Sequence, residues 1–222
     1  EMARAVCRQT MLLCAAGASS ALTIGRLAQT RLHAGCLAAS PSIRMLCADA
    51  PAAPPEIPPF AKLDVRVGRI VEAWEHPDSE KLWVEKIDVG EEEPRQIASG
   101  IRAFYSTKED LEGRAVLVVC NLKAAKLGGV VSNGMVLCAS SEDRSSVAFV
   151  EPPAGALPGE RVLCAGMVDD PASPNQVKKK KLLEGACADL KAIDSVAMYR
   201  GVPLTTASGQ CTSPSIATGT IS

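Results

Sequence analysis

The sequence predicts an all-β fold, a small barrel, between residues 60 and 169. Apolar and polar residues alternate over short runs there, and turns containing glycine or proline separate the runs. One stretch, 101–113, has a pattern compatible with a short helix, because Ser106 and Thr107 precede the charged residues of its first turn. Six or so short strands within about 100 residues are typical of a barrel, which closes a sheet and removes its exposed edges.

The first three strands follow from the alternation of side chains. Residues 63–73 alternate with the period of a half-buried strand, but the phase slips at Gly68. A glycine within a long strand indicates a bulge or bend, as the closure of a small barrel requires. Residues 82–89 and 95–99 predict the second and third strands, and the acidic turn 90–94 joins them.

The next strand differs in pattern from the first three. Residues 115–120 are apolar on both faces, so we expect this strand to be covered on both sides. Further strands are expected at 135–139, 147–150 and 159–162, again bounded by turn residues.

Residues 170–222 are expected to form a small α+β subdomain after a break marked by two prolines. Four lysines, Lys178–Lys181, precede apolar residues at helical spacing. Residues 195–211 predict a closing hairpin, and residues 213–222 are expected to fray. The subdomain has a net charge of +2, whereas residues 60–169 hold 13 Lys and Arg against 18 Asp and Glu, a net charge of −5.

Residues 1–59 differ from the rest in composition. They hold five arginines, no lysine and three acidic residues, which resembles an organellar transit peptide. We therefore expect a disordered leader with a Pro-rich linker at 51–59, in a protein of a plastid or mitochondrion; a cytoplasmic protein with an unaddressed extension is the alternative. Met11 to Ile24 also fits a signal-peptide core. No run of 18 apolar residues predicts a transmembrane helix.

The loop between the strands at 115–120 and 135–139 carries the most informative chemistry. It combines two lysines, a glycine pair and a small polar segment: Lys123, Lys126, Gly128, Gly129, Ser132 and Asn133. Ammonium groups on a flexible backbone, with hydroxyl and amide donors beside them, suit contacts to nucleic-acid phosphates. The alternative is a surface loop with two solvated lysines. Because the barrel is acidic overall, a nucleic-acid face would have to be local.

No pattern points to catalysis or metal binding. The nine cysteines include no Cys-x-x-Cys pair, and their odd number favours free thiols over a disulfide framework. His76, Pro77 and Asp78 have no nucleophile motif beside them, so we interpret them as a structural turn. We expect no catalytic residues, no metal and no cofactor.

Five motifs, in one order and spacing, resemble the tRNA-binding OB-fold domain. They are Leu63–Gly68, His76-Pro77-Asp78 with Leu82-Trp83-Val84, Ile97–Gly100, Asn121-Leu122-Lys123 and Ser132–Met135. This domain occurs in the endothelial monocyte-activating polypeptide II group, in the yeast synthetase cofactor that carries tRNA, and at the C-termini of some methionyl- and tyrosyl-tRNA synthetases. The resemblance covers roughly residues 60–211.

The resemblance implies a non-catalytic, structure-specific tRNA-binding protein that assists aminoacyl-tRNA synthetases by capturing tRNA through its backbone. The implied partners are tRNA and a synthetase, without a membrane. The implied tRNA-binding residues are Lys123, Lys126, Ser132, Asn133, Met135, Ser99 and Arg102. An additional basic patch is expected from Lys178, Lys179, Lys180 and Lys181.

The C-terminal segment resembles the polypeptide II group in particular. Its added subdomain imitates the dimer interface of short bacterial homologues, which implies a pseudo-dimeric monomer. Two positions depart from the family pattern: Gly128 stands where the family carries arginine, and Ala124 where it carries proline. The loop therefore has one cation fewer, and a weaker grip on tRNA is expected.

Two alternatives stay open beside this reading. One is an interaction module that no longer depends on RNA, which the acidic barrel favours. The other is the appended C-terminal domain of a methionyl- or tyrosyl-tRNA synthetase.

Overall fold

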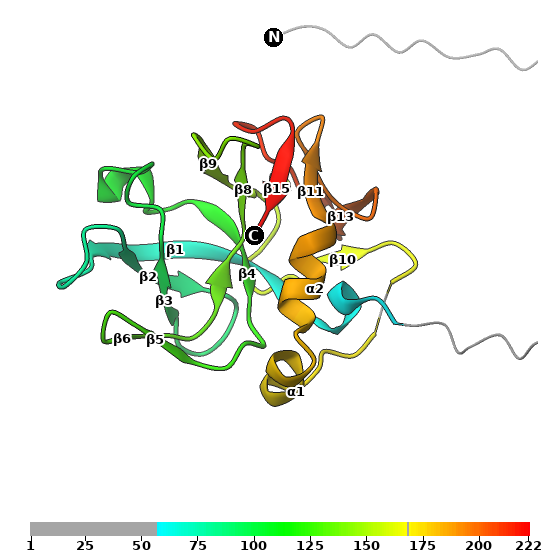
Figure 1. The fold of residues 1–222 in the computed structure, drawn as a ribbon, viewed down its shortest axis with the longest axis horizontal. Helices are drawn as coiled ribbons and strands as arrows, with labels where there is room; N and C mark the ends of the chain where they lie inside the picture. The colour runs from blue at the N-terminus through cyan, green and yellow to red at the C-terminus, as the bar shows by residue number, and fades with distance from the viewer. Residues whose placement is uncertain (1–56, 168) are drawn as a thin grey trace, which may run out of the picture. The chain divides into compact units, whose positions relative to one another are not determined.

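Two β-sheets and a few short helices make up the part of the chain that the structure, a computed structural model, describes: residues 57–167 and 169–222 (Figure 1). The first sheet wraps into a nearly closed five-stranded barrel. The second curls beside it as a half-barrel. This architecture confirms the predicted all-β barrel. The leader expected at residues 1–59 lies almost wholly outside the described residues.

The first sheet is antiparallel throughout and has the order β3-β2-β1-β4-β7. Its strands are β1 (Val65–Glu75), β2 (Trp83–Asp88), β3 (Arg95–Ser99), β4 (Ala115–Val119) and β7 (Met135–Val136). The register of β1 against β2 shifts between Ile70 and Glu72, so the irregularity lies beyond the position expected from Gly68. Gly68 serves packing instead, because a Cβ there would lie 2.6 Å from Cγ2 of Ile87.

The second sheet draws its strands from both predicted parts of the chain. Its order is β10-β13-β12-β11-β15-β8-β9, with β14 paired to β13. The strands are β8 (Cys138–Ser140), β9 (Val147–Phe149), β10 (Leu163–Cys164), β11 (Leu190–Ile193), β12 (Val196–Tyr199), β13 (Val202–Thr206), β14 (Gly209–Gln210) and β15 (Gly219–Ile221). Because β15 pairs with β8, the expected C-terminal subdomain shares one sheet with strands that follow the barrel.

Short helices and one small hairpin complete the described fold. Two 3-10 turns, η1 (Pro59–Lys62) and η2 (Lys108–Asp110), and two α-helices, α1 (Pro174–Lys179) and α2 (Leu182–Asp189), join the strands. A separate two-stranded sheet is formed by β5 (Ala125–Leu127) and β6 (Val130–Ser132). A capping box starts α1, since the Ser173 side chain and the Gln176 side chain each bond the other's backbone N–H.

The short helix expected within 101–113 is present as the single 3-10 turn η2, with Thr107 at its N-cap position. Two other local expectations were wrong. Residues 159–162 form no strand of their own, although they run beside β1 through the bonds from Val67 N–H to the Glu160 carbonyl and from Val162 N–H to the Val65 carbonyl, both 2.8 Å. The segment 213–222 does not fray entirely, because β15 pairs with both β8 and β11.

Strand β4 separates two apolar cores. Val116 and Val118 point into the barrel, with Ile87 and Phe149 among their neighbours in one cluster. Leu117 and Val119 point the other way, into the cluster that includes Phe60, Tyr199 and Ile221. Successive side chains of a strand face opposite sides, so the covering of residues 115–120 on both sides is confirmed.

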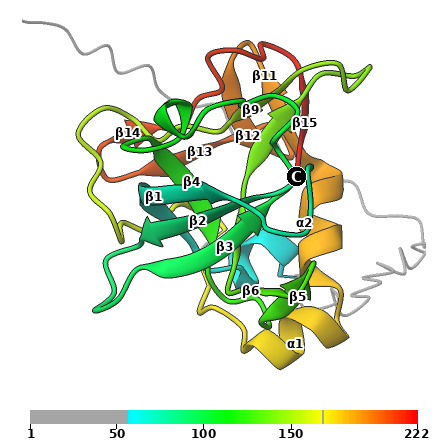
Figure 2. The same ribbon diagram turned by 90° about the vertical axis from the view of Figure 1, so that its left-hand side faces the viewer.

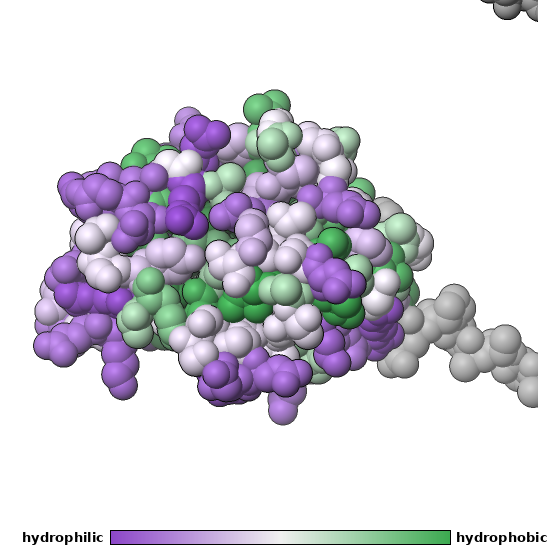
Figure 3. Space-filling view, turned by 90° about the horizontal axis from the view of Figure 1, so that it is seen from above, coloured by the Kyte–Doolittle hydropathy of each residue, from purple (hydrophilic) through white to green (hydrophobic). Residues whose placement is uncertain are grey.

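Hydrophilic and apolar side chains are unevenly distributed over the surface. Seen from above, apolar side chains gather in a band across the middle of the face, and hydrophilic side chains cover its left and lower margins (Figure 3). The hairpin β5–β6 and helix α1 both lie at the lower side of the molecule in Figures 1 and 2, with α1 directly below the hairpin in Figure 2.

One carboxyl group lies inside the barrel. Glu85 on β2 is 0% exposed, between the buried side chains of Trp83 and Ile87 on the same face. Its Oε2 accepts a hydrogen bond from the Ser99 hydroxyl at 3.1 Å, while Oε1 has no hydrogen-bond partner. Burial disfavours the charged form and raises the pKa of Glu85 to about 7, although the bond from Ser99 opposes the shift.

The buried carboxyl predicts a pH-dependent stability. Between pH 4.5 and 7 the folded chain holds a proton on Glu85 that the unfolded chain releases, so stability falls as pH rises through this window. A shift of this size corresponds to about 3 kcal/mol. We expect Glu85→Gln, compared with wild type by urea denaturation at pH 5 and pH 8, to be closer in stability at pH 5 and more stable by a few kcal/mol at pH 8. A difference that does not change with pH would contradict a buried, titrating Glu85.

Candidate nucleic-acid interface

The two lysines of the predicted site stand on the hairpin β5–β6. Lys126 lies within β5 and pairs with Val131, and Lys123 lies at the root of the strand; both side chains are exposed. Gly128 and Gly129 form the two-residue turn, with φ of 58° and 95°. Tight hairpin turns need positive φ at both central positions, which glycine adopts without steric cost. The glycine pair thus sets a tight turn that projects the lysines from the barrel edge.

The root of the hairpin depends on the side chain of Asn121, which is 8% exposed. Its Nδ2 donates to the carbonyl oxygens of Lys62 and Ala172, at 2.9 and 3.0 Å, and its Oδ1 accepts from the N–H of Asp64 at 2.9 Å. One amide therefore joins the end of β4 to η1, to the start of β1 and to the segment that enters α1. Lys123 follows this junction by two residues.

Arg95 ties both roots of the loop to β3. One terminal nitrogen, Nη1, donates to the carbonyl oxygens of Cys120 at 2.6 Å and Asn133 at 3.0 Å. Its Nε and Nη2 form a bidentate pair with the carboxylate of Glu91, at 2.7 and 2.6 Å. Through this hydrogen bond Arg95 lowers the pKa of Glu91, and Glu91 raises the pKa of Arg95. The sequence analysis did not single out Arg95, since nothing in its local pattern reports contacts 25 and 38 residues away.

The two predicted serines lie inside the structure. Ser132 is 4% exposed; its hydroxyl accepts from the N–H of Ala98 at 3.1 Å and donates to the carbonyl of Gly134 at 3.0 Å. Ser99 is 8% exposed and donates to Glu85. Both hydroxyls therefore hold the hairpin and β3 in place, and the geometry gives neither a free donor toward solvent.

The other predicted residues divide in the same way. Asn133 is exposed, and Met135 is half-buried against the core that includes Phe60. Arg102 forms an ion pair with Glu75 at 2.5 Å, donates to the carbonyl of Ser79 at 3.2 Å, and lies 6.0 Å from the Trp83 ring centre. Lys123, Lys126 and Asn133 are thus the predicted residues whose side chains are available to a ligand without rearrangement.

The basic patch lies on the same lower side of the molecule as the hairpin. Lys178 and Lys179 end helix α1, Lys180 caps it, and Lys181 adopts a left-handed conformation with φ of 51° before α2 begins. All four side chains are exposed. Figures 1 and 2 place α1 on the same lower side as the hairpin, and the bond from Asn121 to Ala172 connects the two segments. The fold therefore gathers both groups of lysines onto one side.

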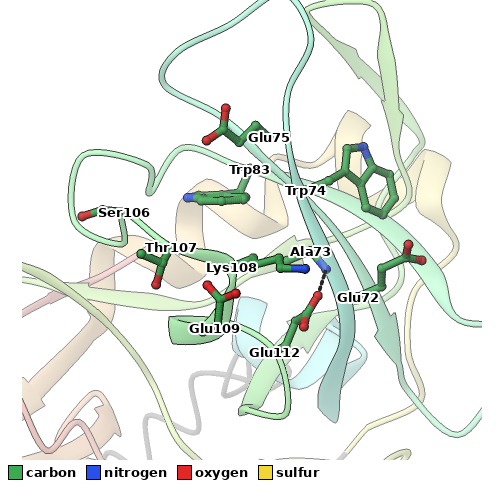
Figure 4. Close-up of a pocket in the computed structure, with 10 residues that line it drawn as sticks. All are labelled: Glu72, Ala73, Trp74, Glu75, Trp83, Ser106, Thr107, Lys108, Glu109 and Glu112. Carbon is green, nitrogen blue, oxygen red and sulfur yellow. Dashed lines mark hydrogen bonds between the residues drawn. The ribbon is translucent and has the colours of Figure 1, made fainter.

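A cavity of about 490 Å³ elsewhere on the barrel has the opposite character. Glu72 and Glu75 approach it from β1, and Glu109 and Glu112 from the loop around η2, with the indoles of Trp74 and Trp83 beside them (Figure 4). Glu112 accepts a hydrogen bond from the N–H of Ala73 at 3.3 Å. Lys86 and Arg102 pair with Glu72 and Glu75, but Glu109 and Glu112 face only Lys108 among the lining residues. The lining therefore stays net negative and is poorly suited to a nucleic-acid backbone.

The described residues show no constellation for other chemistry. Within 57–167 and 169–222, no group of three or more His, Cys, Asp or Glu side chains could hold a metal ion, and no helix is long and apolar enough to cross a membrane. The five cysteines of this part, Cys120, Cys138, Cys164, Cys187 and Cys211, are free. Burial raises the pKa of Cys120 to about 11 and of Cys138 to about 12, so neither is a reactive thiolate near neutral pH.

A five-stranded antiparallel barrel with a basic hairpin at its edge defines an oligonucleotide-binding module of the OB type. Comparisons with known proteins agree with this class of fold. Residues 65–161 match the family model described as "Putative tRNA binding domain". The crystal structure of the C-terminal domain of Plasmodium vivax p43 is similar with a TM-score of 0.66 and 36% identity, covering 73% of this chain and 98% of that one. The chain belongs to the tRNA-binding domain family.

Two curated relatives are aminoacyl-tRNA ligases. The probable methionine–tRNA ligase of Oryza sativa subsp. japonica is 48% identical over 163 residues, 72% of this chain and 20% of that protein. The cytoplasmic tyrosine–tRNA ligase of Xenopus tropicalis is 39% identical over 171 residues, 76% of this chain and 32% of that protein. The chain thus spans between a fifth and a third of the length of these relatives.

The junction at Asn121 yields a stability prediction. Asn121→Ala leaves the N–H of Asp64 and the carbonyl oxygen of Ala172 without their partner, whereas the Lys62 carbonyl keeps its bond from the Ala172 N–H. Each unsatisfied buried group costs about 1–3 kcal/mol. We expect the free energy of unfolding, measured by urea denaturation, to fall by about 2 kcal/mol or more. Asn133→Ala is the matched control, because Asn133 is exposed on the same segment, and it should change stability by less than about 0.5 kcal/mol. Equal effects of the two substitutions would refute the role of Asn121.

Proposed function

We propose that this chain captures folded tRNA through its sugar–phosphate backbone and supplies it to an aminoacyl-tRNA synthetase, without catalysing a reaction itself. The observation that carries the proposal is the lysine hairpin, held at its root by Asn121 and Arg95 on a barrel of the tRNA-binding family. Family membership supports tRNA as the ligand, and the ligases among the relatives support a synthetase as the partner.

The geometry supports backbone contacts over base stacking. Lys123 and Lys126 would each pair with a phosphate, and the Asn133 amide would bond a phosphate or ribose oxygen. Lys178–Lys181 would extend the contact along the lower side of the molecule, because α1 and the hairpin both lie on that side. Aromatic residues make up only 3% of the chain, and Trp83 is buried, so a stacking platform for unpaired bases has little to draw on.

A stand-alone supply role and an appended role use the same surface. The likeness to the C-terminal domain of p43 supports a carrier that acts in trans, and the likeness to parts of methionine and tyrosine ligases supports an appended domain. We favour the carrier. It would work as a monomer, because β15 pairs with β8 and β11 pairs with β15, so the edge of β8 is not open to a second copy.

The hairpin lysines yield the central test. The double variant Lys123→Ala with Lys126→Ala should bind folded tRNA more weakly, and the slope of log K against log salt should shrink by roughly two units, about one for each lost phosphate contact. Anisotropy titrations at several salt concentrations measure both quantities.

The charge-matched control is Lys108→Ala with Lys191→Ala, since Lys108 lines the acidic cavity and Lys191 is exposed on β11. It should keep wild-type binding. Indifference to the hairpin substitutions would exclude this site, and equal affinity for folded tRNA, unfolded tRNA and duplex DNA would exclude structure-specific binding.

A second candidate, an RNA-independent interaction module, draws support from the acidic cavity and from the net charge of −5 over residues 60–169. A synthetase captured by the chain after ribonuclease treatment, with no measurable binding of tRNA by the chain, would favour it over tRNA capture.

Delivery to an organelle is a further proposal, supported by the five arginines and absent lysines of residues 1–59. A fluorescent reporter carrying residues 1–59 should enter plastids or mitochondria. Diffuse cytoplasmic fluorescence would refute a targeting role for residues 1–59.

A further inference from the structure

We propose that His76 is a positioning residue for tRNA binding: it holds the tip of the lysine hairpin against the barrel and so fixes where Lys126 presents its charge. The inference rests on the proposed function, because it concerns the same site. The motif at His76, Pro77 and Asp78 was interpreted from the sequence only as a structural turn.

The imidazole of His76 is 3% exposed and uses both ring nitrogens. Its Nδ1 accepts a hydrogen bond from the backbone N–H of Asp78 at 3.0 Å. Its Nε2 lies 3.0 Å from the carbonyl oxygen of Leu127, the last residue of β5. Since an accepting Nδ1 carries no proton, the hydrogen-bond network assigns the proton to Nε2, which donates to Leu127. The ring thus links its own turn, 76–78, to a strand about 50 residues further along.

The turn of the hairpin lies directly on the ring. A Cβ added at Gly128 would lie 2.6 Å from Cε1 and 2.8 Å from Nε2 of His76, closer than real Cβ atoms approach. The φ of 58° at Gly128 also favours glycine. Gly129, by contrast, has no atom within 4 Å of its added Cβ. The close packing is therefore specific to the face of the turn that meets His76.

The hairpin needs such anchors because its strands have three residues each, and an isolated hairpin of this size is marginal in water. The β6 side is held along its length by Gln96, whose Nε2 donates to the Val131 carbonyl at 2.8 Å, and by the buried Ser132. On the β5 side, the bond from His76 holds the carbonyl of Leu127, the residue next to Lys126.

Fixing Lys126 before binding lowers the entropic cost of ordering the hairpin on tRNA. His76 cannot itself meet a phosphate from its buried position, so its effect on affinity passes through the hairpin. The phosphate contact is made by Lys126, which is exposed and precedes Leu127, the residue that His76 holds.

Two substitutions separate positioning from packing. His76→Phe keeps an aromatic ring for Gly128 to pack on but removes the donor and the acceptor. His76→Gln retains an amide N–H that can reach the Leu127 carbonyl. Ile221→Val is the control for a modest loss of stability far from the hairpin, because Ile221 is buried in β15.

The experiment measures tRNA affinity against salt, and hydrogen exchange of the hairpin amides, at a temperature where every variant is folded. His76→Phe should bind folded tRNA about threefold to tenfold more weakly, as expected for the loss of one net hydrogen bond, with an unchanged salt slope and faster exchange at Val130. His76→Gln should recover most of the affinity, and Ile221→Val should bind as wild type does.

Three outcomes overturn the inference. Wild-type affinity in folded His76→Phe shows that the turn has only a local structural role, while leaving the proposed function intact. A salt slope reduced by about one unit shows direct contact of His76 with phosphate. A wild-type chain that binds no tRNA, with or without Lys123 and Lys126, removes the proposed function and the positioning role together.

Discussion

The described fold depends on one buried amide. Asn121 gives its two N–H groups to the carbonyls of Lys62 and Ala172 and accepts the N–H of Asp64, all within 3.0 Å. Without this amide the Asp64 N–H and the Ala172 carbonyl would lose their partner, whereas the Lys62 carbonyl also accepts a bond from the Ala172 N–H. The same residue lies two positions after the end of β4, bonds the residue that precedes β1 and bonds the segment that leads into α1. The root of the lysine hairpin and the position of the basic helix therefore have a common cause.

The fold places acidic and basic side chains on different parts of the surface. The barrel segment is acidic as a whole, and four of its glutamates surround the cavity between β1 and η2. The exposed hairpin and α1 lysines lie together on the lower side of the molecule. For the proposed capture of tRNA, a local gathering of cations would favour oriented docking over nonspecific adhesion.

The glycine at position 128 changes meaning in the structure. By resemblance it marks a missing arginine and a lighter grip. In the folded chain it lets the turn lie flat on the imidazole of His76, where a Cβ would meet the ring at 2.6 Å. Relative to the family pattern the tip of the hairpin lacks one cation, but its packing on His76 supports the strand that carries Lys126. In the proposed function, affinity would depend on both features, since a preorganised charge loses less entropy on binding than a mobile one.

By itself the sequence determined the class of fold and the strands β1 to β4, and it predicted the region of the candidate site. Those features depend on local alternation and turn residues, because a strand that is buried on one face needs an apolar residue at every second position. Gly128 and Gly129, for example, predict a flexible turn without any partner.

Only the tertiary structure decided which side chains face solvent within the hairpin. Ser132 and Ser99 suited ribose or phosphate by type, yet both hydroxyls are buried, and Ser132 is held by Ala98 and Gly134. Arg95 and His76 gained their roles through contacts 25 to 51 residues distant, and β15 through pairing with β8. Such long-range pairings follow from closing the barrel, and no periodicity within a short window reports them.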